Sequence, residues 1–158
     1  MSRSRPILVA TLCAILVAFL GGSASQPGAW YDGLVKSSLT PPDWVFAPAW
    51  TLIYATCVFA AVRGWRAAIK GGQKTVLITL FAINAVLNVV WSVLFFALQR
   101  PDWALLEVAA LWASVAALIV FLRKITSSGA IVLIPYLLWV MFAAYLNYQV
   151  VVLNPPFG

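Results

Sequence analysis

Histidine is absent from this sequence and acidic residues are scarce. The only carboxylates are Asp32, Asp43, Asp102 and Glu107, against ten lysines and arginines. Without histidine the chain cannot form a Ser-His-Asp triad, a HExxH zinc site or a His-ligated haem. The carboxylates are too few and too scattered for an acidic metal cluster. The sequence therefore predicts no metal site and no resident cofactor, and it argues against general acid–base catalysis.

Cysteine and charge are also rare. Cys13 and Cys57 are the only thiols, and both lie inside apolar runs, which predicts neither a disulfide framework nor a zinc site. Charged residues make up 9% of the chain, where a soluble domain carries roughly a quarter, and the mean hydropathy is +0.99. This composition is typical of membrane proteins. The net charge of +6 comes from short clusters between apolar runs, which indicates control of topology and not nucleic-acid binding.

Long apolar segments are what the chain has in abundance. A helix needs about 20 such residues to cross the hydrocarbon core of a bilayer. Five segments meet this length, over about 7–25, 44–67, 75–98, 103–122 and 130–153. The sequence therefore predicts an all-α membrane protein, a five-transmembrane-helix bundle that forms one domain over residues 1–158.

The connections between these segments contain residues that predict their local structure. Residues 26–43, here called the lid connection, are the longest of them, and Thr40-Pro41-Pro42-Asp43 cannot be helical because proline restricts the residue before it and has no N–H. Gly71-Gly72 predicts a turn after the second helix. Asp102 is the predicted N-cap of the fourth helix.

The first apolar segment has two interpretations. Arg3 and Arg5, a short apolar run and Gly22-Ser23-Ala24 resemble a secretory signal with a small-residue cleavage site. Small residues at every fourth position instead favour a retained helix, because such a stripe allows another backbone to approach closely. These residues are Ala10, Ala14, Ala18 and Gly22.

Positive charge is distributed unequally between the two sides that the connections define. One side holds Arg3, Arg5, Arg63, Arg66, Lys70, Lys74, Arg123 and Lys124, and the other holds only Lys36 and Arg100. By the positive-inside rule the N-terminus is predicted to be cytoplasmic, with the lid connection and the C-terminus outside. A bacterial cell membrane suits this bias, since the rule describes insertion into an energised inner membrane.

The segment from Trp30 to Tyr54 is too aromatic for a passive linker and too rich in proline for an ordinary helix start. We interpret it as the lid and the first wall of a ligand pocket. Further aromatic residues lie on the third and fifth helices, as Trp91 with Phe95 and as Trp139. Such stripes are either core or pocket; as pocket walls they suit a large, planar, apolar ligand.

Polar groups within the spans have structural and functional interpretations. Asn84 and Asn88 lie on the same face of the third helix, where they either bond to neighbouring helices or face a cavity and bond a ligand. Glu107 is a functional candidate because it is an acid within a span. It is otherwise a first-turn anion that the helix dipole favours and that reaches the headgroups. The cluster of Arg63, Arg66, Lys70 and Lys74 is interpreted as a face in contact with lipid headgroups.

Three stretches together resemble the signature sequences of the TspO/MBR family, the translocator proteins or peripheral-type benzodiazepine receptors. They are WYDGLVKSSLTPPDWVFAPAWTLIY, NAVLNVVWSVLFF and PYLLWVMFAAYLN, in the family's order and spacing. The resemblance covers nearly the whole chain. It implies a retained first helix, five transmembrane helices, a homodimer in the lipid membrane and a pocket covered by the lid connection. It also implies binding of porphyrins such as protoporphyrin IX, or of other apolar planar molecules.

The resemblance assigns residues by position. The ligand-binding residues would be Tyr31, Pro41, Trp50, Tyr54, Asn88, Trp91, Trp139 and Ala143. Light-dependent porphyrin breakdown in the family would use Trp50 and Trp139. Leu39 replaces an aromatic common in the family, which is expected to loosen the lid. No Lys or Arg follows Tyr148, so the cholesterol-recognition stretch of animal members is incomplete.

Three functions follow as hypotheses. The first is a receptor or carrier for a porphyrin-type ligand, with a role in tetrapyrrole transport or regulation. The second is an enzyme that degrades the porphyrin with light or oxygen, through Trp50 and Trp139. The third is a regulatory or structural membrane protein that acts through its dimer surface. The small-residue stripe on the first helix and a second stripe on the fourth, Ala109, Ala113 and Ala117, are equally suitable for this.

Overall fold

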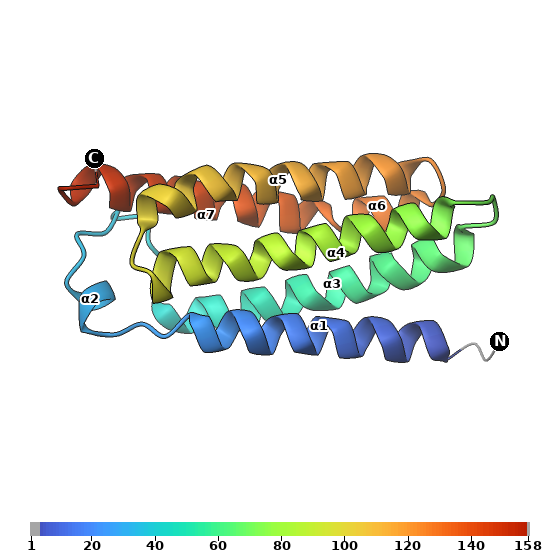
Figure 1. Cartoon of the computed structure of the whole chain (residues 1–158), viewed down its shortest axis with the longest axis horizontal. Coiled ribbons are helices and arrows are strands. Elements are labelled where there is room, and N and C mark those ends of the chain that lie inside the picture. Colours follow the sequence, from blue (N-terminus) through green and yellow to red (C-terminus); the bar gives the residue numbers. More distant parts are fainter. Residues whose placement is uncertain (1–3, 158) are drawn as a thin grey trace.

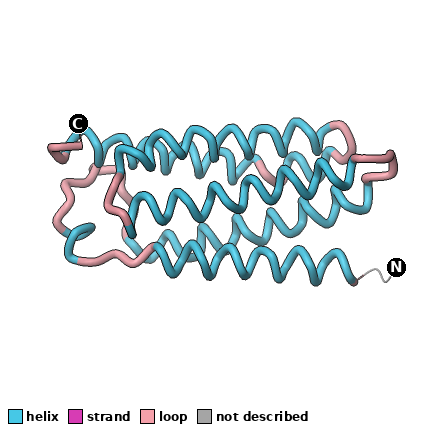
Figure 2. Tube along the Cα trace, viewed as in Figure 1, coloured by secondary structure: helices cyan, strands magenta, loops and turns pink. Residues whose placement is uncertain are grey.

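The computed structural model of the protein describes residues 4–157. Five long helices lie side by side in it (Figure 1). The helical elements are α1 Arg5–Ala24, α2 Ala29–Asp32, the 3₁₀ turn η1 Asp43–Val45, α3 Phe46–Ala67, α4 Gln73–Ser92, the π-helical turn η2 Val93–Ala97, α5 Pro101–Arg123, α6 Ser127–Ile131 and α7 Ile134–Leu153. No strand occurs within the described residues (Figure 2). Five spans, from Arg5–Ala24 to Ser127–Leu153, are long and apolar enough to cross a bilayer. The predicted all-α, multi-pass membrane fold is confirmed.

Three of the predicted spans are not single α-helices, and the second span begins with the 3₁₀ turn η1 before α3. The fifth is divided into α6 and α7, because Pro135 has no N–H to donate and instead occupies the first turn of α7. The third continues beyond α4 as the π-helical turn η2. Such turns add a residue within a helix and often occur at functional sites. Here η2 directs Phe95 and Phe96 towards the lid connection.

The start of α5 differs from its prediction. Pro101 occupies the first turn and Arg100 is the N-cap, so Asp102 is not the cap. A proline at this position loses no hydrogen bond, because the first N–H groups of a helix have no intrahelical partner. Asp102 instead accepts a hydrogen bond of 2.8 Å from Nε of Arg100 and forms an ion pair with that guanidinium. The Gly71-Gly72 turn is confirmed, and Gly72 has a φ of 82°, which glycine adopts without strain.

The core lies between α5, α4 and α7. Its fully covered side chains include Val115, Leu118 and Leu122 of α5, and Leu133 before α7. In contrast, α1 lies against α3 and α4, away from α5 and α7 (Figure 1), and Gly21 is its only buried residue among those described. A Cβ at Gly21 would lie 3.7 Å from Oγ of Ser92 and 3.8 Å from Oδ1 of Asn88. The close approach of α1 therefore occurs at Gly21.

The small-residue stripe of α1 borders two cavities. A Cβ at Gly22 would meet nothing within 4 Å. Ala10, Ala14, Ala18 and Gly22 line cavities between α1 and the other helices, so their small side chains leave space open beside the contacts that α1 makes with α3 and α4.

A chain of polar side chains joins four helices at mid-depth. Tyr54 donates to Asn88 (3.1 Å), Asn88 donates to the hydroxyl of Tyr136 (3.1 Å), and Tyr136 donates to Asn84 (3.3 Å). Asn84 in turn donates to Ser114 at 2.8 Å, and Ser114 donates to the Leu111 carbonyl. Asn84 thus has the structural role proposed for it. Hydrogen-bonded groups are tolerated in an apolar interior where unpaired ones are costly.

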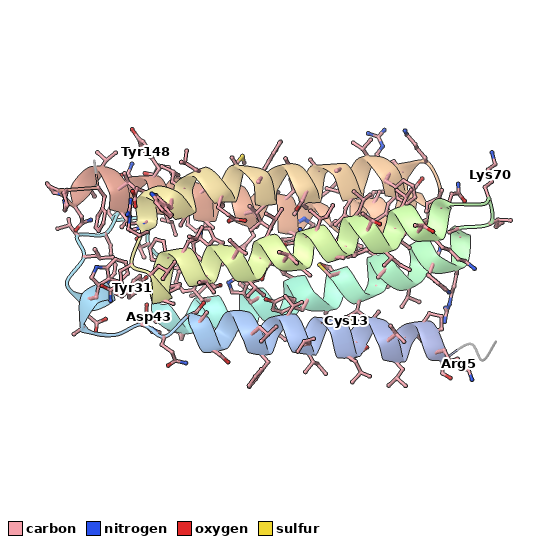
Figure 3. All side chains as sticks on the ribbon, in the orientation of Figure 1. Arg5, Cys13, Tyr31, Asp43, Lys70 and Tyr148 are labelled. Atoms are coloured by element: carbon pink, nitrogen blue, oxygen red, sulfur yellow. The ribbon has the colours of Figure 1, made fainter. Side chains whose placement is uncertain are left out.

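The two ends of the bundle differ in charge. Arg5 and Lys70 lie at one end, and Tyr31 and Asp43 lie at the other (Figure 3). The clusters around Arg63 and Arg123 belong to the Arg5 end, because Arg63 lies in the last turns of α3, which leads to Lys70, and Arg123 ends α5 next to the connection to α6. Arg3 lies outside the described residues. The arrangement of the connections therefore agrees with the predicted separation of charge.

Two glycines give a matched test of packing. A Cβ at Gly64 would lie 2.7 Å from Cδ2 of Leu122 and 3.0 Å from Cδ1 of Leu77, both of which are fully packed. We expect Gly64→Ala to lower the free energy of unfolding by about 1–2 kcal/mol through overpacking. Gly22→Ala should raise it by about 0.5 kcal/mol, because alanine is the better helix former and space is free. Thermal unfolding in detergent measures both, and shifts in the same direction would contradict this packing.

Candidate functional site

A cavity of about 500 Å³ opens beneath the lid connection and is here called the lid cavity. Its walls come from the lid connection, α1, α3, α4 with η2, and α7. Seven of the eight predicted ligand-binding residues line it: Tyr31, Trp50, Tyr54, Asn88, Trp91, Trp139 and Ala143. Pro41 does not, and its neighbours Thr40 and Asp43 line the cavity in its place. The size is that of an ordinary small-molecule pocket.

The side walls of the lid cavity are flat aromatic rings. Trp50 stacks on Tyr54, with ring centroids 5.7 Å apart and planes inclined by 29°. Trp91 stacks on Phe95 at 5.2 Å and 22°. Trp139 meets Phe46 edge to face at 6.0 Å. The stripes that were ambiguous in sequence therefore serve as pocket wall on one side and pack against the core on the other.

Polar atoms in these walls are held in fixed orientations. Nε1 of Trp91 donates to Oδ1 of Asn147 at 3.2 Å, and Nδ2 of Asn147 donates to the Pro101 carbonyl at 2.8 Å. Asn88 is held between Tyr54 and Tyr136, as described above. Asn88 thus combines both interpretations of its sequence position, since it bonds to neighbouring helices and also lines a cavity. Fixed orientations of this kind favour a preorganised site.

The lid connection is attached at two points. Its short helix α2 contacts η2, where Trp30 packs on Phe95 at 5.9 Å and Tyr31 on Phe96 at 5.5 Å. Farther along, Val35 donates its N–H to Oδ1 of Asn154 at 2.8 Å, and Nδ2 of Asn154 donates to the Val35 carbonyl at 2.9 Å. Sequence reasoning missed Asn154. No local pattern links residues 119 positions apart, although an asparagine after the last helix is a capping signal.

Lys36 is a second residue that sequence reasoning missed as a site residue. Its side chain lines the lid cavity, with Nζ 4.1 Å from the ring centroid of Tyr31. Burial, and then the carboxylates of Asp43 and Asp32, raise the pKa of the Tyr31 hydroxyl. The Tyr31 hydroxyl, protonated at neutral pH like that of any tyrosine, therefore stays a hydrogen-bond donor to higher pH than usual. The sequence contains one signal for Lys36: it is one of only two cations, with Arg100, on the lid side of the predicted spans.

Two other predicted residues lie outside the cavity. Leu39 is 61% exposed and does not line the lid cavity. Glu107 lies in the second turn of α5, since the helix begins at Pro101, and both of its carboxylate oxygens are covered without a hydrogen-bond partner among the described residues. The interpretation of Glu107 as a first-turn anion in contact with headgroups is therefore wrong.

The side chains of the lid cavity are suited to binding a ligand. Flat rings can stack on a planar ligand, and Lys36 can pair with an anionic substituent. Within residues 4–157 no three His, Cys, Asp or Glu side chains cluster closely enough to hold a metal ion.

The attachment of the lid connection can be tested directly. Asn154→Ala removes both hydrogen bonds to Val35, so backbone amides of residues 33–38 should exchange with deuterium about tenfold faster. Hydrogen exchange with mass spectrometry measures this. Asn154→Asp keeps the acceptor for the Val35 N–H and should give an intermediate rate; equal exchange in all three proteins would contradict the attachment.

A family model and several known proteins are similar in sequence to this chain. The model of the TspO/MBR family matches residues 9–153. Tryptophan-rich protein TspO of Archaeoglobus fulgidus is 37% identical, over 93% of this chain and 96% of its own length. The protein of the same name from Chlorobaculum tepidum is 34% identical over 96% of this chain and 99% of its own. Translocator protein of Sus scrofa is 34% identical over 85% and 84%. The chain therefore belongs to the TspO/MBR family and is a multi-pass integral membrane protein.

Proposed function

We propose that the chain is a membrane receptor or carrier for a porphyrin, such as protoporphyrin IX, or a related planar apolar molecule. The observation that carries this is the lid cavity, whose walls are formed by two stacked aromatic pairs, Trp50 with Tyr54 and Trp91 with Phe95, and by the edge-to-face pair of Trp139 and Phe46. A tetrapyrrole ring would lie between Trp50 and Trp139. Its carboxylates would point to the lid connection, where Lys36 supplies the cation. Membership of the TspO/MBR family supports this choice of ligand.

Fluorescence titration tests the proposal. Protoporphyrin IX added to the purified protein should quench tryptophan emission in a saturable, one-to-one manner, because three indoles line the lid cavity. The variant Trp50→Phe/Trp139→Phe should show smaller quenching at saturation. No quenching, or quenching equal to that of the unsubstituted protein, would reject the proposal.

Degradation of the bound porphyrin is a second candidate function. Trp50 and Trp139 line the same cavity, so both indoles would contact one ligand. In the enzymatic hypothesis they would pass electrons between the light-excited porphyrin and molecular oxygen. Illumination of the protein with protoporphyrin IX in air should then give a new bound absorption spectrum. The same spectrum from Trp50→Phe/Trp139→Phe, or no change on illumination, would leave binding alone.

The ligand would enter from outside the cell under the proposed topology. The Arg5 end carries most of the basic residues, which favours its retention in the cytoplasm. The lid connection then faces the exterior. A reporter active only in the cytoplasm, fused after Gly158, should be inactive in a bacterial host; strong activity would reverse the assignment.

A further inference from the structure

A second and larger cavity lies on the opposite side of the mid-depth polar chain. It has a volume of about 620 Å³, lies between α1, α3 and α4, and is here called the α1 cavity. Its lining runs along α1 from Arg5 to Val17 and ends at Tyr54, Asn84, Asn88 and Tyr136. Tyr54 and Asn88 line both cavities, so the polar chain forms the partition between them.

The α1 cavity results from the way that α1 packs. Among the described residues of α1 only Gly21 is buried, and it lies beside Ser92 and Asn88. Towards Arg5, the side chains of α1 that line the cavity include the small ones of Ala10 and Ala14, and none of the described residues in this part of α1 is buried. The space left behind is as large as many ligand sites, and a bilayer supplies apolar molecules to fill it.

The chemistry of the α1 cavity differs between its ends. At the deep end, the polar atoms of Tyr54, Asn84 and Asn88 already bond to one another or to Tyr136, so this end presents no polar group in need of a partner. At the mouth lie the Arg5 guanidinium and the ring of Trp65, which carries the Lys74 ammonium 4.8 Å from its centroid. Arg5 makes no ion pair or hydrogen bond with another described side chain. No carboxylate lines this cavity.

The length of the α1 cavity favours a ligand with a single hydrocarbon chain. Arg5 and Val17 are separated by roughly 18 Å along the helix axis. One leaflet of the hydrocarbon core is about 15 Å deep, which is the depth that one acyl chain spans. Since α1 contacts both α3 and α4, helices flank the cavity on either side. We propose that the α1 cavity binds a long-chain fatty acid, with its carboxylate at Arg5 and its chain directed towards Tyr54. This site is separate from the proposed porphyrin site.

Tritiated palmitate tests this proposal. The full chain is reconstituted in phosphatidylcholine nanodiscs, and binding is measured by scintillation proximity with empty nanodiscs subtracted. We expect saturable binding of one palmitate per chain, displaced by unlabelled palmitate. Methyl palmitate, which lacks the anion, should displace it about tenfold less well. Uptake that does not saturate, or equal displacement by the methyl ester or by a two-chain phosphatidic acid, would overturn the proposal.

Matched variants locate the site. Arg5→Gln should weaken palmitate binding about tenfold, whereas Lys70→Gln, at an exposed cation of the same end, should not. Ala14→Phe should fill the cavity and abolish saturable binding, whereas Leu12→Phe, on the exposed face of α1, should not. Protoporphyrin titration of the Ala14→Phe protein should be unchanged, which shows that the bundle is intact and keeps the two proposals independent. Equal palmitate binding by Ala14→Phe and Leu12→Phe would reject the α1 cavity as the site.

Discussion

Replacing Ala143 with phenylalanine should lower the affinity for protoporphyrin IX by at least about tenfold, or about 1.4 kcal/mol. Ala143 lies on α7 one turn from both Trp139 and Asn147, and all three line the lid cavity. A phenyl ring at this position would occupy space that the planar ligand needs. Because the substitution removes no hydrogen bond, the loss would be steric.

The measurement is the same fluorescence titration, with Ala110→Phe as its matched control. Ala110 is exposed on α5 and lines neither cavity, so its substitution adds the same ring on the lipid-facing surface. Thermal unfolding of both variants checks that the bundle is preserved. Equal porphyrin affinity in the two proteins would place the ligand away from Ala143 and so outside the lid cavity.

The number and approximate position of the spans could be predicted because lipid imposes a simple length requirement. Nearly every predicted boundary lies within a few residues of the structure. The exceptions depend on backbone hydrogen bonding. Pro135 divides the last span, and Pro101 begins α5. Both prolines lie in the first turn of a helix, and that position depends on the hydrogen bonds of the flanking turns, which hydropathy does not show. The π-helical turn at Val93–Ala97 has no distinctive composition, so hydropathy could not reveal it.

The aromatic walls of the candidate site could be predicted because their residues are numerous and regularly spaced. Trp50, Trp91 and Trp139 each lie on a different predicted span, and all three line the lid cavity. The lid connection was harder, because its contacts join distant segments. Asn154 holds Val35 from the far end of the chain, and Lys36 lines the cavity whereas Pro41 does not. A loop is positioned by such individual contacts, which leave no periodic pattern in the sequence.

The α1 cavity could not have been inferred from composition. A stripe of small residues is equally compatible with two backbones in contact and with an open space beside the helix. The choice depends on where α1 is buried against the bundle, and its buried residue among those described is Gly21, one position away from the stripe. Lipid-facing and cavity-facing positions of α1 are both apolar, so the sequence does not distinguish them either.

The partition between the cavities should also be the most sensitive polar element of the bundle. Asn84→Leu leaves the Tyr136 hydroxyl without its acceptor and Ser114 without the Asn84 donor, at positions where both side chains are buried. We expect the free energy of unfolding to fall by about 2–3 kcal/mol. Tyr136→Phe removes the hydroxyl and with it two hydrogen bonds of the same chain, and it should cost about 1 kcal/mol, since each hydrogen bond between membrane helices is weak.

The double variant separates a connected chain from independent bonds. In Asn84→Leu/Tyr136→Phe the unpaired hydroxyl is gone, so the loss should be smaller than the sum of the single losses by about 1 kcal/mol. Reversible unfolding in mixed micelles containing dodecyl sulfate, followed by circular dichroism, measures all three variants. Simple additivity would contradict the connection between Asn84 and Tyr136. Coupling of this size would mean that the groups separating the porphyrin site from the fatty-acid site hold one another in place, so that ligand in either cavity meets a common, fixed wall.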